Sequence, residues 1–500
     1  MRRRWAVAAG ALLVLGFGLR VALYFPLAAF PIDSDGVLAG LCALAVRTGQ
    51  HPAFFPGGYR LGAASCYVTA AFFTFAGASR TALALTGLTW GASYVAASAA
   101  FARAALGARA GCFAIAFAAF PAAAFLTVTY VPWGYGEIAA SCALTLWLAV
   151  LLRRRESTWL AAAFGLSAGA GVWMSLQTAM VTLPALVWIV AHRRPTRREW
   201  LACAVAACAG SWPWLVANVS GGFPTFAHNW VAVPVSGAGA LWSNAVWFFT
   251  SPLPQLFTYG GGPSTWLPLT AGILLALGAL VASLRDDAAT SDGALRPREL
   301  AWLCAGVALA TFLLDVFSTA GSVRGWTVRY LTPLYVVAPI AFALGIDWLW
   351  RSRLRALALA ALALLILPNV ALYDLPGTPG RAVLGAQLDA DRKMRAFLAS
   401  HRIGLVYGDY FDVYHINFDA RGTAAVPSIP ALDYLGYGAT LGRSPVAWAV
   451  VLPPGAGVPA ALAGLGAGGG VEGFGGTRLF VASHRSGDAA ELLAALRLIR

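Results

Sequence analysis

Long apolar runs alternate with short clusters of arginine over the first 373 residues of this 500-residue chain. A helical run of about 20 apolar residues is long enough to cross the ~30 Å hydrocarbon core of a bilayer. Hydrophobic residues make up 59% of the chain and charged residues 11%, whereas a soluble domain has about 25% charged residues. The pattern therefore predicts an all-α polytopic membrane protein.

The net charge of +14 does not indicate nucleic-acid binding, because the basic residues lie in short clusters between apolar runs and form no continuous basic face. Residues 2–4 are arginines, and the apolar run after them continues to Phe25. That run is longer than the core of a signal peptide and lacks a clear Ala-x-Ala cleavage site. We expect an uncleaved first span with a cytoplasmic N-terminus.

The arginine clusters define the expected topology, because spans between cytoplasmic clusters must come in pairs. The clusters are residues 2–4, Arg103 with Arg109, residues 153–155, residues 193–198, Arg285 with Arg296 and Arg298, and residues 351–355. Eleven spans follow, near residues 5–27, 81–102, 110–129, 137–152, 157–174, 177–191, 199–218, 265–284, 299–318, 328–349 and 356–373. The expected fold class is a membrane protein of about 11–13 transmembrane helices with an extracytoplasmic C-terminus.

Two shorter apolar stretches, 61–79 and 244–260, are expected to remain on the outer side as re-entrant or juxtamembrane helices. The first belongs to an outer loop over residues 28–80, and the second is interrupted by Pro252 and Pro254. The transmembrane module is expected over residues 1–373.

Residues 374–500 differ in character, since acidic residues become frequent there. We expect a small extracytoplasmic α/β domain. Its predicted strands are 403–407, 447–452 and 478–483, its predicted helices are 388–400 and 488–499, and a Gly/Ala/Pro-rich flexible loop is expected over 453–476.

The seven cysteines all precede residue 305, and no Cys-x-x-Cys pair suggests a metal site. Most lie inside apolar runs. We interpret all seven as small core residues.

Three carboxylates fall at the outer ends of predicted spans: Asp33, Asp35 and Glu137. Only 21 residues of the chain are acidic, and a carboxylate beside hydrocarbon is costly, so such a residue usually marks function. A polar stop at the membrane interface is the alternative. Trp133 and Tyr135, beside Glu137, suit either a flat ligand such as a sugar ring or an interfacial aromatic belt.

The same side carries few basic groups, among them His51, Arg60, Arg80, Arg324 and Arg329. An arginine at the start of a span either snorkels to the interface or binds a phosphate through its guanidinium. A carboxylate base and a phosphate-binding arginine suit sugar transfer from a lipid phosphate, with attack at the anomeric carbon inverting its configuration. Burial raises the pKa of such a carboxylate toward working pH.

Several segments resemble, in order, the GT-C-fold membrane glycosyltransferases related to dolichyl-phosphate-mannose protein mannosyltransferases and to aminoarabinose lipid A transferases. They are the run from Asp33 to Ala43, the run from Gly49 to Tyr59, Gly134-Tyr135-Gly136-Glu137, the helix from Gly171 through Pro184, and Arg329-Tyr330-Leu331-Thr332-Pro333. The resemblance covers most of residues 10–350.

The resemblance implies that an aspartate of the first outer loop is the catalytic base, and an alanine eight residues later, Ala43, selects Asp35. Many relatives have glutamate directly after this aspartate, where this chain has Gly36, so Asp33 is a substitute for that second acid. Glu137 matches the acid of the second outer loop. The resemblance also implies a basic phosphate ligand, for which Arg329 is favoured over Arg324, Arg60 and Arg80.

The expected function is an inverting glycosyltransferase using a polyprenyl-phosphate sugar at the outer face of a bacterial inner membrane or plasma membrane. Tyr59, His51, Trp133 and Tyr135 are the expected sugar or acceptor pocket. A divalent cation such as Mg²⁺ or Mn²⁺, held by Asp35 and Glu137, is optional. The acceptor is a lipid, glycan or protein.

Two other classes of function stay open. A transporter or flippase would carry charges near mid-membrane, and Asp315 lies inside a predicted span. The predicted spans show no internal repeat, which argues against that class. A scaffold that displays the outer domain would tolerate Asp35→Asn.

Overall fold

The structure is a computed structural model of the chain. It describes residues 2–27, 34–56, 61–130, 132, 134–227, 235, 237–257, 263–285, 294–318, 327–373, 379–419, 424–427, 447–452, 458, 469–474 and 477–481. The chain forms two compact units. The helical unit comprises Met1–Tyr24, Tyr59–Ala64 and Thr86–Tyr373, and the mixed unit comprises Phe25–Gly58, Ser65–Leu85 and Asp374–Arg500. Most of residues 28–80 thus group with the C-terminal segment.

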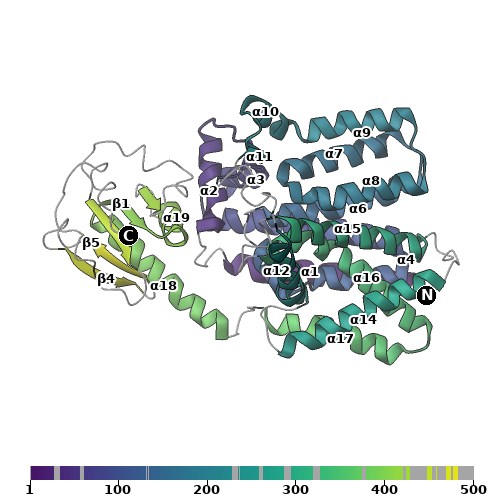
Figure 1. The fold of residues 1–500 in the computed structure, drawn as a ribbon. Helices are drawn as coiled ribbons and strands as arrows, with labels where there is room; N and C mark the ends of the chain where they lie inside the picture. Colours follow the sequence, from purple (N-terminus) through teal and green to yellow (C-terminus); the bar gives the residue numbers. More distant parts are fainter. Residues whose placement is uncertain are drawn as a thin grey trace. The chain divides into compact units, whose positions relative to one another are not determined.

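Helices of the helical unit lie side by side (Figure 1). A helix lies on each of the eleven predicted spans. Twelve helices cover these eleven spans, because α4 extends over two of them, α5 completes the second of these, and α9 and α10 share one. The helices are α1 (Arg2–Leu27), α4 (Arg80–Ala119), α5 (Ala123–Thr129), α6 (Tyr135–Arg154), α7 (Thr158–Met174), α8 (Ala179–His192), α9 (Arg197–Gly210), α10 (Trp212–Ser220), α14 (Pro263–Arg285), α15 (Pro297–Phe317), α16 (Thr332–Arg351) and α17 (Arg355–Ala371). Among the described residues, five helices are long and apolar enough to cross a membrane, or six if the bent α9–α10 pair is one span.

The 40-residue α4 is two helices joined at a break, as the two predicted spans over it require. Gly107 adopts φ 78° and ψ −158°, a left-handed conformation that glycine tolerates. The two halves pack closely, because a Cβ added at Gly111 would lie 3.1 Å from the carbonyl oxygen of Ala102. The chain therefore reverses at the arginines on either side of Gly107.

Two other predicted helices are interrupted. The predicted span 199–218 bends by 66° between α9 and α10, where Pro213 lacks a backbone donor. The helix expected from Gly171 through Pro184 breaks at Ser175, whose backbone is extended. A short 3₁₀ helix, η1 (Leu176–Thr178), then leads into α8.

The two shorter apolar stretches form short helices, and their placement on the outer side stays a prediction. Over 61–79 the helix is α3 (Ala64–Ala76), 13 residues long. It rises about 20 Å, too little for a ~30 Å hydrocarbon core. Over 244–260 the chain forms α12 (Ala238–Thr250) and α13 (Pro252–Gln255), and the break falls at Pro252.

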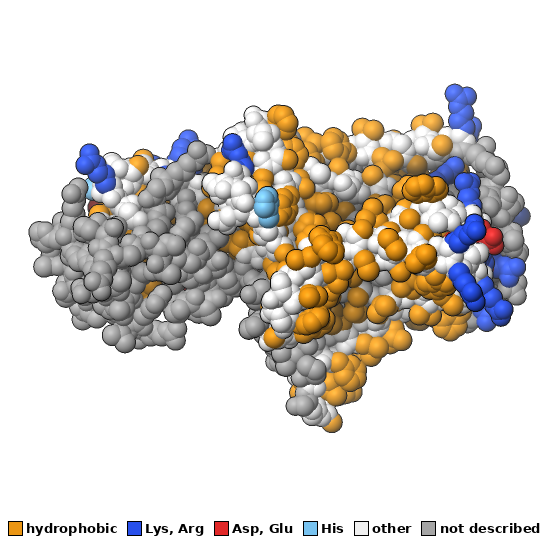
Figure 2. Space-filling view, turned by 90° about the horizontal axis from the view of Figure 1, so that it is seen from above, with side chains coloured by type: hydrophobic (Ala, Val, Ile, Leu, Met, Phe, Trp, Pro, Cys, Tyr) orange, Lys and Arg blue, Asp and Glu red, His pale blue; other side chains and the backbone are white. Residues whose placement is uncertain are grey.

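One end of the helical unit gathers the arginines, as Figure 2 shows over the described surface. We call this the arginine end; it carries Arg109, Arg153, Arg193, Arg296, Arg298 and Arg351. Asp347 binds Arg109 at 2.5 Å and Arg351 at 2.8 Å. Arg153 pairs with Glu299 at 3.5 Å, and Arg193 pairs with Glu199. The prediction that these separate clusters share one side is confirmed.

The mixed unit contains a five-stranded sheet in the order β2-β1-β3-β5-β4. β1 (Ile403–Gly408) is parallel to β2 (Ala424–Pro427) and to β3 (Ala447–Leu452). β5 (Thr477–Val481) is antiparallel to β3 and to β4 (Gly470–Phe474). Helix α18 (Pro379–Ser400) contributes Met394 and Leu398 to the core under the sheet. The predicted α/β character is confirmed.

Three elements of this unit were not predicted: β2, β4 and α19 (Tyr410–Asp419). β4 lies inside the expected flexible loop 453–476, so that part of the prediction is wrong. Its sequence, Gly470 to Phe474, contains two glycines and is mostly exposed at the edge of the sheet, which removes the usual alternation of a strand. The predicted helix 488–499 lies outside the described residues.

Candidate functional site

Asp35 is the second residue of α2 (Ser34–Arg47) and is half-buried. A carboxylate in the first turn is stabilised in its charged form by the positive end of the helix dipole. Asp33, its neighbour in sequence, lies outside the described residues. The first turn of α2 therefore positions the Asp35 carboxylate.

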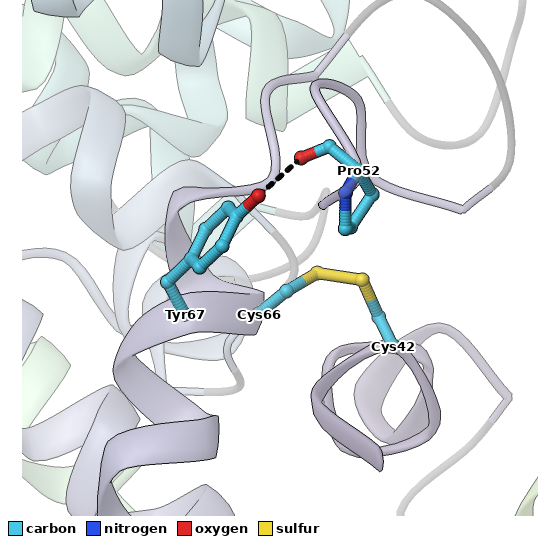
Figure 3. The surroundings of a disulfide bond; sticks show 4 residues. All are labelled: Cys42, Pro52, Cys66 and Tyr67. Atoms are coloured by element: carbon cyan, nitrogen blue, oxygen red, sulfur yellow. Dashed lines mark hydrogen bonds between the residues drawn. A yellow bond between two sulfur atoms is a disulfide. The ribbon is translucent and has the colours of Figure 1, made fainter. Parts of the chain in front are cut away.

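A disulfide between Cys42 and Cys66 joins α2 to α3, with the Cα atoms 5.4 Å apart (Figure 3). The hydroxyl of Tyr67 also donates to the carbonyl oxygen of Pro52 at 3.0 Å, which ties the loop between the helices to α3. The interpretation of all seven cysteines as small core residues did not include this bond, although Cys42 and Cys66 are both buried. It is wrong for Cys208, which is exposed, whereas Cys112, Cys142 and Cys304 are buried.

The C-terminal segment packs directly on the helix of Asp35. α19 contacts α2, and a Cβ added at Gly40 would lie 2.4 Å from the ring of Phe418. The Phe418 ring also lies 6.4 Å from that of Phe73 in α3. Only glycine at position 40 allows this approach. α2 is thus held from one direction by a disulfide and from another by an aromatic ring.

The basic and aromatic residues predicted near this loop differ in their surroundings. Arg80 is buried and pairs with Asp391 of α18 at 3.5 Å, so its charge has a partner within the protein. His51 lies in an exposed turn after α2. Tyr59 and Arg60 lie outside the described residues.

In the helical unit, Glu137 lies in the first turn of α6 and is fully buried. α6 begins after Gly134, whose φ of 110° favours glycine. A Cβ at Gly134 would also lie 2.9 Å from the Leu61 side chain. Tyr135, the first residue of α6, is buried, and Trp133 lies outside the described residues.

Arg329 lies against the same turn. It belongs to the 3₁₀ helix η4 (Thr327–Leu331), and its guanidinium carbon is 5.9 Å from the ring centre of Tyr135 and 5.3 Å from that of Tyr330. Stacking on two aromatic rings stabilises the cation while leaving the guanidinium edge suited to hydrogen bonds. The prediction that Arg329 and Glu137 share one end is confirmed by this contact. Arg324 lies outside the described residues.

No family model matches the chain, and the comparison with curated proteins found no match. Solved structures do match. That of ArnT from Cupriavidus metallidurans bound to undecaprenyl phosphate has a TM-score of 0.60 and 14% identity, covering 95% of this chain and 98% of that one. Its apo form gives a TM-score of 0.60 and 17% identity, over 97% and 98%.

The archaeal oligosaccharyltransferase AglB from Archaeoglobus fulgidus, in complex with an inhibitory peptide and a dolichol-phosphate, also matches. Its TM-score is 0.50 at 12% identity, and the match covers 89% of this chain and 69% of AglB. The chain has a GT-C fold. At these identities the likeness shows the fold alone.

Within this GT-C fold, the break at Ser175 brings further polar groups to the end that holds Glu137. η1 packs against α6 and α16, and Leu61 forms an antiparallel bridge with Ser175. In the described part of the chain, the side-chain oxygen of Gln177 and the hydroxyl of Tyr330 are buried and have no hydrogen-bond partner. Both residues lie in segments that carried the resemblance, but hydropathy alone assigned them no role.

Asp315 was also missed as a site residue. It lies two residues before the end of α15 and is 2% exposed. Neither of its carboxylate oxygens has a hydrogen-bond partner among the residues that the structure describes. α15 contacts η4, so this acid lies at the same end of the helical unit as Arg329.

The described residues contain no group of three or more His, Cys, Asp or Glu side chains placed to hold a metal ion. The optional cation site at Asp35 and Glu137 stays a prediction. The arrangement described above offers instead a cation stacked on aromatic rings and buried carboxylates, which are the groups needed to bind a phosphate and to move a proton.

Proposed function

We propose that the chain is an inverting glycosyltransferase that moves a sugar from a polyprenyl phosphate to an acceptor hydroxyl or amine. The observation that carries the proposal is the position of Arg329, stacked on Tyr135 in the turn of α6 that holds buried Glu137. The chain shares its fold with ArnT, whose structure contains undecaprenyl phosphate. An arginine that contacts the turn of a buried carboxylate supplies groups that can hold a phosphate and orient a sugar.

We assign one task to each group, and the role of Asp35 rests on the sequence resemblance. Asp35 accepts the proton of the acceptor as the acceptor attacks the anomeric carbon from the side opposite the phosphate. The bond from the anomeric carbon to the phosphate oxygen breaks, and the electron pair stays on the phosphate. Arg329 stabilises this added charge through charge-assisted hydrogen bonds. Glu137 orients the sugar or the acceptor, and inversion follows from the single displacement.

Two features support an orientation with the arginine end in the cytoplasm. Arginine-rich loops stay on the cytoplasmic side. The Cys42–Cys66 disulfide follows α1, and disulfides form in oxidising compartments. We therefore propose an inner or plasma membrane location, with the loop of Asp35 and the C-terminal segment outside the cytoplasm.

The transporter alternative loses its main support. Asp315 suggested a charge in mid-membrane, but it lies in the last turn of α15. Turnover separates the two functions, since a flippase moves the donor without breaking the sugar–phosphate bond.

The test is release of polyprenyl phosphate by the purified full-length protein. A panel of polyprenyl-phosphate sugars is incubated with a bacterial envelope extract as acceptor source, and free polyprenyl phosphate is measured. We expect release by the wild type and a loss of about 10²–10⁴-fold in Asp35→Asn. Asp389→Asn, at an exposed carboxylate of α18, is the matched control and should retain activity. Full activity in Asp35→Asn would remove this residue from the mechanism.

A further inference from the structure

A groove of about 690 Å³ runs between α8 and α15 at the arginine end, at the start of α15 and away from Asp315 in its last turn. Its apolar lining includes Pro184, Val187, Trp188, Trp302, Gly306 and Leu309. Val187, Trp302 and Leu309 are 57–69% exposed, so the described protein leaves the groove open to its surroundings.

Specific contacts between α8 and α15 define the groove. Pro184 lies inside α8, and a Cβ added at Gly306 would lie 3.3 Å from the Pro184 side chain, so the two helices meet closely at this level. Nearer the arginine end, the indole nitrogen of Trp188 donates to the carbonyl oxygen of Glu299 at 2.9 Å. These contacts fix the spacing of the groove walls.

The charges around the groove lie at one end only. Arg296 and Arg298 line it and are exposed, and both stand at the start of α15. Glu299 also lines it, but its carboxylate pairs with Arg153 at 3.5 Å. The ring nitrogen Nδ1 of His192 is bonded to the carbonyl oxygen of Trp188 at 2.8 Å. The mouth therefore keeps a net positive charge from two arginines.

The apolar part extends away from these arginines. From Arg298 to Leu309 the helix rises about 16 Å, roughly half of the hydrocarbon core. An occupant that matches this layout has an anionic head and an apolar tail that reaches toward mid-membrane.

We propose that this groove binds one anionic glycerophospholipid, with its phosphate at Arg296 and Arg298 and an acyl chain along Trp302 and Leu309. Basic pockets between transmembrane helices bind anionic lipid headgroups in this way. The donor lipid is a different ligand, because Arg329 precedes α16 and Arg351 ends it, which separates Arg329 from the arginine end by about 30 Å.

Native mass spectrometry of the purified full-length protein tests the proposal. Delipidated protein is mixed with equal amounts of phosphatidylglycerol, phosphatidylcholine and undecaprenyl phosphate, and the retained lipids are counted. We expect one phosphatidylglycerol bound in preference to phosphatidylcholine. R296Q/R298Q should lower its retention about 30-fold, since each basic residue near an anionic headgroup contributes about fivefold.

A second variant removes the tail site without touching the charges. Ala305 lines the groove and is exposed, so Ala305→Trp fills it and should also reduce phosphatidylglycerol retention. The matched controls are R197Q/R198Q and Ala204→Trp, at exposed positions of α9 outside the groove, and both should bind as the wild type does. Equal retention of the two glycerophospholipids, unchanged retention in either groove variant, or preferential capture of undecaprenyl phosphate there would each overturn the proposal.

Discussion

At the arginine end of the helical unit, several charged side chains form ion pairs with one another, whereas at the opposite end Glu137 and Asp315 are buried and Arg329 stacks on aromatic rings. α16 separates the two ends clearly, since Arg351 at its last residue binds Asp347 and Arg329, just before its first residue, stacks on Tyr135. α6 repeats the arrangement, with Glu137 in its first turn and Arg154 at its last residue. We propose that the ion-paired charges of the arginine end serve anchoring and that the charges of the opposite end serve ligand binding.

Of the residues that distinguish the two ends of the helical unit, Glu137 should give the largest effect. Glu137→Gln keeps the volume of the side chain but removes its charge, so the helix should form while turnover falls about 10²–10³-fold. Release of polyprenyl phosphate measures this. Glu156→Gln, at an exposed acid just beyond the arginine end of α6, should have no effect. Equal losses of turnover in Glu137→Gln and Glu156→Gln would contradict the proposed difference between the two ends.

The Cys42–Cys66 disulfide tests whether the chain after α1 lies in an oxidising compartment. Five of the seven cysteines are free, so alkylation of the denatured, unreduced protein should label five, and reduction should raise this to seven. Cys42→Ser should lower stability by about 3 kcal/mol, because the bond closes a loop of about 25 residues. Seven labels before reduction would contradict the bond and the extracytoplasmic placement of this loop.

Arg329 should affect donor binding more than the structure of the protein. Arg329→Gln removes a charge-assisted contact with phosphate worth about 1.5–3 kcal/mol, so affinity for polyprenyl phosphate should fall about 10- to 100-fold. Binding to immobilised protein measures it. Arg197→Gln at the start of α9 is the control from the arginine end. A larger loss of affinity in Arg197→Gln would place phosphate binding at the arginine end and contradict the role of Arg329.

The smallest effect is expected at Asp347. Asp347→Asn withdraws the carboxylate shared by Arg109 and Arg351, whose side chains are 34% and 36% exposed. Their exposure screens the interaction, so a loss of about 1–2 kcal/mol in stability is expected, with turnover per folded molecule unchanged. Thermal unfolding in detergent measures the first quantity. A selective loss of turnover would mean that this end takes part in catalysis.

The sequence predicted the helices well because apolar length and arginine position are both set by the bilayer. It predicted that Glu137 and Arg329 share an end for the same reason. It placed a boundary near Ser175, between the predicted spans 157–174 and 177–191, but apolar length does not show which side chains this boundary brings to the end that holds Glu137. Gln177 was consequently given no role.

The disulfide was missed for a related reason. Cys42 and Cys66 lie in separate apolar helices, and their 24-residue separation does not indicate whether those helices meet. The contact of α19 with Gly40 likewise joins segments far apart in the chain. Such contacts depend on tertiary packing, which local pattern does not encode.

The most direct test is an experimental map of the protein with bound undecaprenyl phosphate. We predict phosphate density within hydrogen-bond distance of the Arg329 guanidinium, beside Tyr135. Phosphate density at Arg296 and Arg298 instead, or no contact with Arg329, would contradict the assignment of donor binding to this end.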